Sequence, residues 1–599
     1  MSLAIFLRLY KIDFQSLWMD EIYTLNVTNP KFSLTELNQN IYISEAFPYL
    51  YYYLLRLVYF FFGYSALIVR LVSAISGICT VYYIYSFGKH LFIKSFGLIA
   101  SFLLAINEVH IQYSQEARPY ALYILFTVLA FYRLSIFIKN TNLKNALWYA
   151  FFAALMLNFN FFALLNLFSQ GLILLAFIII KPKSKKINLF KLSALSLIIA
   201  LLLFVHNIPI IKVVLNYTSF WVPAPTSNSF LLLFSEFLGS SETTVFIFGT
   251  LILYFFVVLF NSDFQFDKIK NLYDNALIYT SFICFFWFIG FFSIVMVKSY
   301  IGTSVILLRY FLSLLPVLIL IISMGLHSIK NSITKIGILL IISIFTIINL
   351  TVIKKYYSLP HKSQYREVSQ FIIKNNTNNV PVYTSLKNMY GYYLNDETNI
   401  LIKNTLEGHI REMMADSTKI APFWYADAHV RPYALSNDYE AFLNKYFTMD
   451  TNFNGFDAWT RYYSLKNEKS QLDIKKFYPL KNTNGNDALY NFDSFTFDGS
   501  VLTTWGWAFT VNQDATESRI SVVLIKDDVA HQVETQSTKR PDVTASRNNE
   551  FDLDNSGFEV KQKLTNIIKP GVYTLGIYIK NSAQQTESLI VTDKIITLP

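Results

Sequence analysis

Charged residues are scarce in this sequence of 599 residues, where they make up 15% of the total, against about 25% in an ordinary soluble domain. Hydrophobic residues make up 53%, and this balance excludes a single soluble domain. Only two cysteines occur, Cys79 and Cys284, and both lie inside apolar runs. They provide neither a disulfide framework nor the spacing of a metal site.

The scarcity of charge is confined to the first part of the chain. Residues 1–355 hold 25 basic and 12 acidic residues, whereas residues 356–599 hold 25 and 28. The net charge is therefore +13 in the first part and −3 in the second. The first part is typical of a membrane protein and the second has ordinary soluble polarity. The basic residues lie between hydrophobic segments rather than in a patch, so nucleic acid is not indicated as a partner.

Long apolar segments predict transmembrane helices in the first part. Together with a short segment at residues 1–11, they predict about eleven helices. Residues 1–11 are too short to cross a bilayer of about 30 Å, so we expect either a truncated first helix or a start further upstream. The other segments are about 66–90, 92–107, 119–139, 144–158, 160–180, 190–210, 244–261, 276–297, 304–326 and 333–353.

Lysine and arginine in the short loops predict the orientation of these helices. If the helices alternate, all five basic loops lie on one side, which is then the cytoplasm. This places residues 12–65, 108–118, 211–243 and 298–303 outside, together with everything after 355. The run Pro48–Phe62 is short and contains Arg56, and it is interpreted as a helix at the outer interface. The basic loop residues are Lys89 and Lys94; Arg133, Lys139 and Lys144; Lys181, Lys183, Lys185, Lys186 and Lys191; Lys268 and Lys270; Lys330 and Lys335.

The pattern changes after residue 355. Residues 356–490 mix helical and short strand-like stretches, which indicates an extracytoplasmic α/β domain. Residues 491–599 alternate apolar and polar residues between turns, which is typical of a β-sandwich. The predicted organisation is therefore a transmembrane domain at 1–355, an α/β domain at 356–490 and a β-sandwich at 491–599.

Charges near the membrane surface are the candidate functional residues, because a charge there is costly unless it is paired or used. Asp20 and Glu21 follow an interfacial tryptophan, although they are also readable as two solvated loop acids. Arg118 opens the helix from 119, where it either snorkels to the interface or forms an anion site with free backbone amides. Arg309 lies inside an apolar run, where an anion partner and snorkelling are the alternatives.

These residues together favour one kind of chemistry. A carboxylate can activate an acceptor while two arginines hold a lipid-linked phosphate leaving group. Transport is favoured less, because transporters usually show repeats or charges at the bilayer midplane, and neither is found here. The alternatives are a flippase for lipid-linked saccharides and a non-catalytic, membrane-anchored binding protein.

Five segments in one order resemble family 39 glycosyltransferases, the bacterial relatives of protein O-mannosyltransferases and of the aminoarabinose transferase. The resemblance covers most of residues 1–370. It implies a GT-C fold and an enzyme that takes a sugar from a polyprenyl-phosphate carrier outside the membrane. The segments are LWMDE (17–21), FPYLYYYLLRLVYFFFGYSALIVRLVSAISG (47–77), YSQEARPYAL (113–122), WVPAP (221–225) and LLRYFLSLLP (307–316).

The resemblance implies roles for the candidate residues. Asp20 is the general base for in-line attack on the anomeric carbon with inversion, and Glu21 orients Asp20 or the acceptor. Arg118 and Arg309 hold the donor phosphate. The remaining residues of the same motifs are expected to bind substrate; they are Gln115, Glu116, Tyr120 and Tyr310.

One departure from the family concerns residues 47–49. Family members often have His-Pro-Pro where this chain has Phe47-Pro48-Tyr49, so a role for that histidine is lost, and Glu45 is a substitute. No metal site is evident, and a requirement for a divalent cation stays open. The expected partners are a polyprenyl-phosphate sugar, an acceptor lipid, glycan or protein, and the bilayer of the plasma membrane. The C-terminal domains are expected outside it, in the periplasm of a Gram-negative cell.

Overall fold

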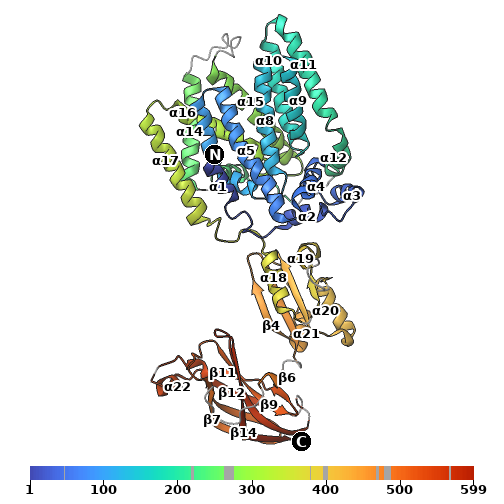
Figure 1. Cartoon of the computed structure of the whole chain (residues 1–599), viewed down its shortest axis with the longest axis vertical. Coiled ribbons are helices and arrows are strands. Elements are labelled where there is room, and N and C mark those ends of the chain that lie inside the picture. The colour runs from blue at the N-terminus through green and yellow to red at the C-terminus, as the bar shows by residue number, and fades with distance from the viewer. Residues whose placement is uncertain are drawn as a thin grey trace. The chain divides into compact units, whose positions relative to one another are not determined.

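The computed structural model describes residues 1–45, 47–216, 222–239, 241–261, 275–377, 379–394, 402–432, 434–466, 471–477, 488–548, 550–564, 568 and 570–599. The chain forms two compact units (Figure 1). The first comprises Met1–Asn375, Leu386–Asn399 and Asn454–Trp459, and the second comprises Asn376–Ser385, Ile400–Phe453 and Thr460–Pro599. The predicted domain boundaries at 355 and 490 stay predictions.

The described part of the first unit is built from helices. Two helices, α18 and α19, come from the segments after residue 355. The helices are α1 (Ser2–Leu9), α2 (Met19–Val27), α3 (Leu34–Ser44), α4 (Leu50–Phe62), α5 (Ala66–Leu91), α6 (Lys94–Ile106), α7 (Glu108–Ser114), α8 (Tyr120–Lys139), α9 (Leu143–Leu157), α10 (Ala163–Ile180), α11 (Lys183–Leu202), α12 (Ile208–Leu215), α13 (Ser229–Phe237), α14 (Glu242–Asn261), α15 (Ala276–Ile301), α16 (Leu315–Ser328), α17 (Ser332–Ile348), α18 (Tyr365–Asn375) and α19 (Lys387–Leu394).

Six of the described helices are long and apolar enough to cross a membrane, or eight spans if two bent helix pairs count as one each. The chain is therefore a multi-pass membrane protein. The number is lower than the eleven expected because some apolar segments form shorter helices, among them Leu50–Phe62 and Leu143–Leu157. One of the bent pairs, Lys94–Ile106 with Glu108–Ser114, turns by 64°. After this bend, α7 packs against α5 and α8.

Close packing of small residues holds the helices together. A Cβ atom at Gly97 of α6 would lie 2.5 Å from the backbone oxygen of Tyr85 in α5. Only glycine allows this approach, as in many membrane helix pairs. Elsewhere aromatic rings fill the contacts, and the rings of Phe131 in α8 and Trp287 in α15 stack with their centroids 3.9 Å apart.

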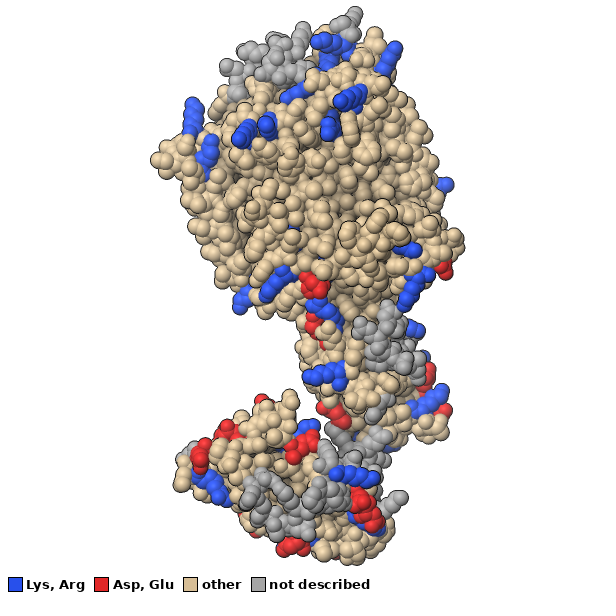
Figure 2. Space-filling view, in the orientation of Figure 1, with Lys and Arg blue, Asp and Glu red and all other residues tan. Residues whose placement is uncertain are grey.

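Four of the five basic turns lie at one end of the helical unit. The Lys139 ammonium donates to the backbone oxygen of His90, and Lys181 donates to that of Ile138, at 3.2 and 3.0 Å. The contact between the rings of Phe92 and His327 joins the turn of Lys330 and Lys335 to the turn of Lys89 and Lys94. Lys268 and Lys270 of the fifth turn lie outside the described residues. Figure 2 shows Lys and Arg gathered toward the two ends of this unit, with a nearly uncharged belt between them.

The second unit begins with a five-stranded sheet of order β2-β1-β3-β5-β4. β1 pairs in parallel with both β2 and β3, so the chain crosses over between them through a helix. This arrangement is the predicted α/β domain. The elements are β1 (Val382–Thr384), β2 (Ile402–Asn404), α20 (Leu406–Ala415), β3 (Phe423–Ala428), α21 (Asn437–Tyr446), β4 (Phe447–Asn454) and β5 (Ala458–Leu465).

Two antiparallel sheets follow, of order β14-β13-β9-β10-β6 and β11-β12-β8-β7. Buried residues of both sheets, such as Leu502 and Phe558 in one and Val522 and Ile577 in the other, form a shared core. The predicted fold class, with a helical membrane core and a C-terminal β-sandwich, is confirmed. The elements are β6 (Gln471–Asp473), β7 (Ala488–Phe497), β8 (Val501–Thr510), β9 (Ser518–Lys526), β10 (Val529–Gln532), β11 (Gln536–Thr538), α22 (Pro541–Ser546), β12 (Gly557–Lys563), β13 (Gly571–Asn581) and β14 (Thr586–Leu598).

Candidate functional site

Polar residues gather at the end of the helical unit that lies opposite the lysine turns. The helices α5 and α8 run between the two ends, because their last residues adjoin the lysine turns and their first residues adjoin the polar cluster. The first turn of α2, the connection between α7 and α8, the short helix η3 (Leu308–Tyr310) and the chain just before α18 all contribute to it. The structure therefore brings together segments that the sequence spreads over more than half of the chain.

Asp20 and Arg309 form an ion pair at this end. A carboxylate oxygen of Asp20, in the first turn of α2, lies 2.7 Å from a guanidinium nitrogen of Arg309 in η3. Their side chains are 23% and 15% exposed, so the pair is partly open to solvent. Burial alone would lower the pKa of Arg309, but Tyr120 and Asp20 raise it above its usual value. Arg309 is therefore a permanent cation beside an accessible carboxylate.

Glu21 is the neighbour of Asp20 in sequence, but it is fully buried. Its carboxylate accepts two hydrogen bonds from Arg70 at 3.0 and 3.1 Å, one from Lys362 at 2.7 Å and one from the backbone of Ala117 at 2.8 Å. Burial alone would raise the pKa of Glu21, but Arg70 and Lys362 lower it to about 2. Glu21 is thus saturated with donors and acts on the site by holding α2, α5 and the start of α8 together.

Arg118 lies further inside the protein than Asp20, and its side chain is 4% exposed. Its guanidinium donates to the backbone oxygen of Asp20 at 3.0 Å, to the Thr24 hydroxyl at 2.6 Å and to the Glu45 carboxylate at 2.9 Å. The group also lies over the ring of Phe47, 4.8 Å from its centroid. Burial would lower the pKa of Arg118, but Glu45 raises it well above the usual value. The anion that the sequence predicts beside Arg118 is supplied here by the protein.

Glu116 is a second buried carboxyl group near Asp20, but it has few partners. One of its oxygens lies 3.9 Å from the Lys362 ammonium, and the other has no hydrogen-bond partner among the described residues. Burial, opposed by Lys362 and reinforced by the charges of Glu21 and Asp20, raises the pKa of Glu116 to about 7. Because burial and the charge of Glu21 both disfavour a second carboxylate here, the pKa of Glu116 lies above that of Glu21.

The remaining predicted residues have other surroundings. The Gln115 amide donates to the backbone oxygens of Arg8 and Tyr10 at 3.1 and 3.0 Å and accepts from the Tyr356 hydroxyl at 3.0 Å. It therefore ties the end of α1 to the chain that leaves the last membrane helix. Its amide is used by these backbone contacts, and the expected role in substrate binding stays a prediction.

Two tyrosines were predicted to bind substrate. The ring of Tyr120 is buried and lies edge-on to Tyr113 and Phe47, with centroids 5.2 and 5.8 Å apart. The ring of Tyr310 stacks on Phe162 with centroids 4.7 Å apart. Tyr120 therefore lies against the Arg118 side of the cluster, and Tyr310 lies on the side of α10. Trp221, the first residue of the predicted WVPAP motif, lies outside the described residues.

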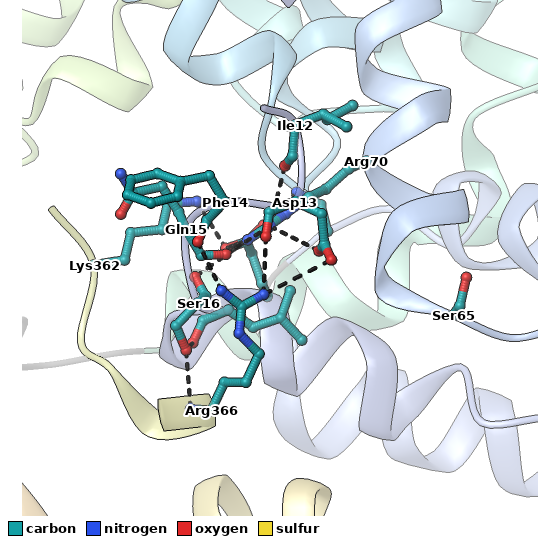
Figure 3. Close-up of polar contacts among 12 residues, drawn as sticks. Ile12, Asp13, Phe14, Gln15, Ser16, Ser65, Arg70, Lys362 and Arg366 are labelled. Carbon is teal, nitrogen blue, oxygen red and sulfur yellow. Dashed lines mark hydrogen bonds and ion pairs between the residues drawn. The ribbon is translucent and has the colours of Figure 1, made fainter. Parts of the chain in front are cut away.

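Two arginines hold the backbone segment 12–16, which leads to Asp20 (Figure 3). Arg70 donates to three of its carbonyl oxygens at 2.8–3.2 Å. Arg366, in α18, donates to two more at 2.7 and 2.9 Å. The carboxylate of Asp13 lies 3.5 Å from Arg70 and 3.8 Å from Arg366. The position of Asp20 therefore depends on a helix that follows the last membrane span.

Sequence reasoning missed Arg70 and Lys362 and gave Glu45 only a minor role. Arg70 had a detectable signal, since a cation in a spanning helix needs a partner. Lys362 had none, because it is an ordinary lysine in a polar segment. Within the described residues, no group of three or more histidine, cysteine, aspartate and glutamate side chains is arranged to hold a metal ion.

The raised pKa of Glu116 predicts a pH dependence of stability. The pKa of Glu116 is about 7 in the folded protein and 4.5 in the unfolded chain. Between pH 4.5 and 7 the folded protein therefore keeps a proton on this group that the unfolded chain has lost. Its contribution is therefore complete below pH 4.5 and is lost as the pH rises to about 7. We expect the melting temperature of the purified protein to fall over this interval. Glu116→Gln should remove most of the fall and Asp13→Asn should not; equal slopes in all three proteins would contradict the assignment.

Comparison with known proteins agrees with the resemblance found in the sequence. The profile of the family described as dolichyl-phosphate-mannose-protein mannosyltransferase matches residues 47–210. This range includes Arg118 and Glu116 and begins after Asp20. A search of curated protein sequences finds no match.

Solved structures resemble this chain more extensively. ArnT from Cupriavidus metallidurans bound to undecaprenyl phosphate has a TM-score of 0.51 at 9% identity, over 77% of this chain and 96% of that chain. The same protein in the apo state has a TM-score of 0.50 at 9% identity, over 77% and 95%. AglB from Archaeoglobus fulgidus, in complex with an inhibitory peptide and a dolichol-phosphate, has a TM-score of 0.44 at 10% identity, over 100% and 92%. The likeness to ArnT identifies the architecture of the chain.

Proposed function

From the GT-C fold of membrane glycosyltransferases, which this chain has, we infer that it transfers a sugar from a polyprenyl-phosphate carrier to an acceptor. The observation that carries this proposal is the ion pair of Asp20 and Arg309, partly open to solvent, 2.7 Å apart and at one end of the membrane helices. It juxtaposes a proton acceptor with a cation that can meet a phosphate. The ArnT structure with a similar fold holds undecaprenyl phosphate, which supports a carrier of this chemical class.

In the proposed reaction the Asp20 carboxylate takes the proton from an acceptor hydroxyl or amine. The acceptor atom then forms a bond to the anomeric carbon, and the bond from that carbon to the phosphate oxygen breaks. The electron pair leaves with the polyprenyl phosphate, whose added charge Arg309 compensates. Attack from the face opposite the phosphate inverts the anomeric centre. A phosphate ester is already a good leaving group, so positioning and charge compensation carry much of the rate.

Arg309 and Arg118 have different roles in this proposal. Arg309 is the phosphate ligand, since its side chain is partly exposed and its partner Asp20 is released when the donor arrives. Arg118 is buried against Glu45 and donates to the backbone of Asp20. Arg118 is therefore assigned the positioning of Asp20, and its contribution to holding phosphate is through charge at longer range.

The proposed location is the plasma membrane, with Asp20 and the second unit on the extracytoplasmic side. The lysine turns at the opposite end support this orientation through the positive-inside rule. The lipid-linked donor is thereby met outside the cell, where nucleotide sugars are absent. The acceptor is a lipid, glycan or protein of the envelope.

The proposal predicts a specific defect for Arg309→Gln. A hydrogen bond from a cation to a phosphate oxygen is worth enough to raise KM for the donor roughly 10- to 100-fold. KM for the acceptor should stay near the wild-type value. Arg309→Lys should recover part of the affinity because it keeps the charge, and Lys298→Gln, which removes a cation from the last turn of α15, is the control. An unchanged donor KM in Arg309→Gln would remove Arg309 from the donor site.

Reconstituted protein provides the test of the function itself. Liposomes containing the purified chain and undecaprenyl-phosphate-linked sugars are incubated with envelope extracts, and mass spectrometry follows free undecaprenyl phosphate and glycosylated product. Release of the carrier together with product is the expected result. Movement of an intact lipid-linked sugar across the bilayer without cleavage would identify a flippase instead. Comparing glycolipids and glycoproteins of cells with and without the gene then names the acceptor.

A further inference from the structure

A shallow, open groove on the surface at the other end of the helical unit lies far along the bundle from Asp20. It has a volume of about 610 Å³ and is lined by Leu143, Lys144, Leu147, Trp148 and Phe151 of α9. The apolar members among them are 42–53% exposed. They repeat at helical spacing, so they form one face of α9 that no described element covers. Their rise of 1.5 Å per residue makes this apolar face about 12 Å long.

A partly buried cation adjoins this groove. The guanidinium of Arg133, in the neighbouring helix α8, lies 5.3 Å from the centroid of Trp148 and 5.7 Å from that of Phe152. Its Nε atom is buried and has no hydrogen-bond partner among the described residues. Arg133 lies six residues before the end of α8 at Lys139, or about 9 Å along the helix. A cation at this depth in a spanning helix calls for an anion.

The stretch of sequence that contains this groove holds no acidic residue. Between Glu116 and Glu236 the sequence holds ten lysines and arginines and no aspartate or glutamate. Lys144, which lines the groove, and Arg133 form no ion pair with any described residue of the chain. Aromatic rings stabilise the guanidinium of Arg133 through cation–π contacts, which leaves its hydrogen-bonding capacity for a ligand.

We propose that this groove is a binding site for one anionic glycerophospholipid. The phosphate lies between Arg133 and Lys144, and an acyl chain lies along Leu147, Trp148 and Phe151. The bilayer that surrounds α9 provides such lipids in large excess over polyprenyl phosphate, so mass action favours them as the occupant. Anionic headgroups are concentrated at a cytoplasmic surface, where the lysine turns are predicted to lie. The site is independent of the catalytic proposal, which concerns the opposite end of the unit.

Quenching of Trp148 by brominated lipids tests this site. The full chain is reconstituted in phosphatidylcholine containing a small fraction of either dibromo-phosphatidylglycerol or dibromo-phosphatidylcholine. The signal of Trp148 is the difference between the wild type and Trp148→Phe. We expect dibromo-phosphatidylglycerol to reach half-maximal quenching at a lower mole fraction than dibromo-phosphatidylcholine. The ratio of these two fractions measures the preference for the anionic lipid. Arg133→Gln and Lys144→Gln should each reduce this ratio about fivefold. Lys144→Gln alters an exposed residue and leaves the fold intact.

A matched pair of variants and a competitor decide the result. Lys89→Gln with Lys94→Gln removes two exposed cations from the same end without touching the groove, and it should keep the preference. Equal quenching by both lipids in the wild type would overturn the site, because it would show ordinary lipid contact. An equal effect of the control pair would also overturn it, as general surface charge. If decaprenyl phosphate relieved the quenching at a lower mole fraction than phosphatidylglycerol needs to produce it, the groove would be a site for the carrier lipid instead.

Discussion

Replacing Asp20 with asparagine is expected to reduce sugar transfer by roughly 10²–10⁴-fold, the range that a general base contributes. Asparagine is isosteric with aspartate, but it cannot accept the proton of the acceptor. The measurement is the rate of carrier release from undecaprenyl-phosphate sugar by the reconstituted protein at saturating donor. The pair of Asp20 with Arg309 is partly open to solvent, unlike the fully buried pair of Glu21 with Arg70, so its loss should cost less stability. The variant should therefore melt close to the wild type.

Asp13→Asn is the matched control for this experiment. Asp13 lies seven residues earlier on the same polar end, and its side chain is 56% exposed beside Arg70 and Arg366. Its loss removes one carboxylate without removing the proposed base, so transfer should stay within about threefold of the wild type. Transfer by Asp20→Asn at the rate of Asp13→Asn would show that Asp20 is not the base. A protein that only binds saccharides would show no transfer in any of the three forms.

The donor itself distinguishes loss of the base from loss of binding. Asp20→Asn frees Arg309 from its carboxylate partner, so donor affinity should stay the same or increase. Arg309→Gln should have the opposite pattern, with weaker donor binding and a smaller effect at saturating donor. The two variants therefore separate proton transfer from charge compensation within one ion pair.

Much of the helical unit was predictable because hydropathy is a local property of the chain. The apolar segments and the lysine turns depend on residues that are close in sequence, and the structure joins four of those turns at one end. Helix length was less predictable. Where α6 breaks at Asn107 and continues as α7, a single apolar run becomes a bent pair. The bend depends on contacts such as that of Asn107 with the backbone of Phe237, which are remote in sequence.

The sequence was sufficient to predict which charged residues belong to the candidate site, but not which of them form ion pairs with one another. Asp20, Arg118 and Arg309 each stood out as charges near a membrane surface. Which anion meets which cation depends on the packing of α2, α5 and α8, and no sequence pattern encodes it. Adjacent residues of α2 point about 100° apart. Asp20 consequently faces Arg309 at the surface, whereas Glu21 faces the buried Arg70.

The burial of Glu21 predicts the largest effect on stability. Removing one partner of a buried ion pair leaves the other charge without compensation, which costs about 3–5 kcal/mol. Glu21→Gln should therefore lower the melting temperature of the detergent-purified protein sharply. Asp20→Asn and Asp13→Asn, one and eight residues away, should not. The contrast depends on burial, since the three substitutions remove the same charge.

A double-mutant cycle with Arg70 isolates the pair. Arg70→Met alone should destabilise the protein about as much as Glu21→Gln, because it leaves a buried carboxylate with fewer donors and frees the carbonyl oxygens of segment 12–16. The combination of Glu21→Leu with Arg70→Met should cost less than the sum of the two single changes, since neither charge is then left unpaired. Additive losses would show that Glu21 and Arg70 act independently.

The low pKa of Glu21 gives this network its own pH signature. A carboxyl group with a folded pKa of about 2, against 4.5 in the unfolded chain, stabilises the fold fully above pH 4.5 and loses that contribution as the pH falls toward 2. This interval lies below the one in which Glu116 acts. We expect the melting temperature of the wild type to fall steeply as the pH drops below 4.5. The melting temperature of Glu21→Gln should change much less over the same interval. If Glu21→Gln lost as much stability below pH 4.5 as the wild type, the ionised form of Glu21 would not be what holds α2 to α5.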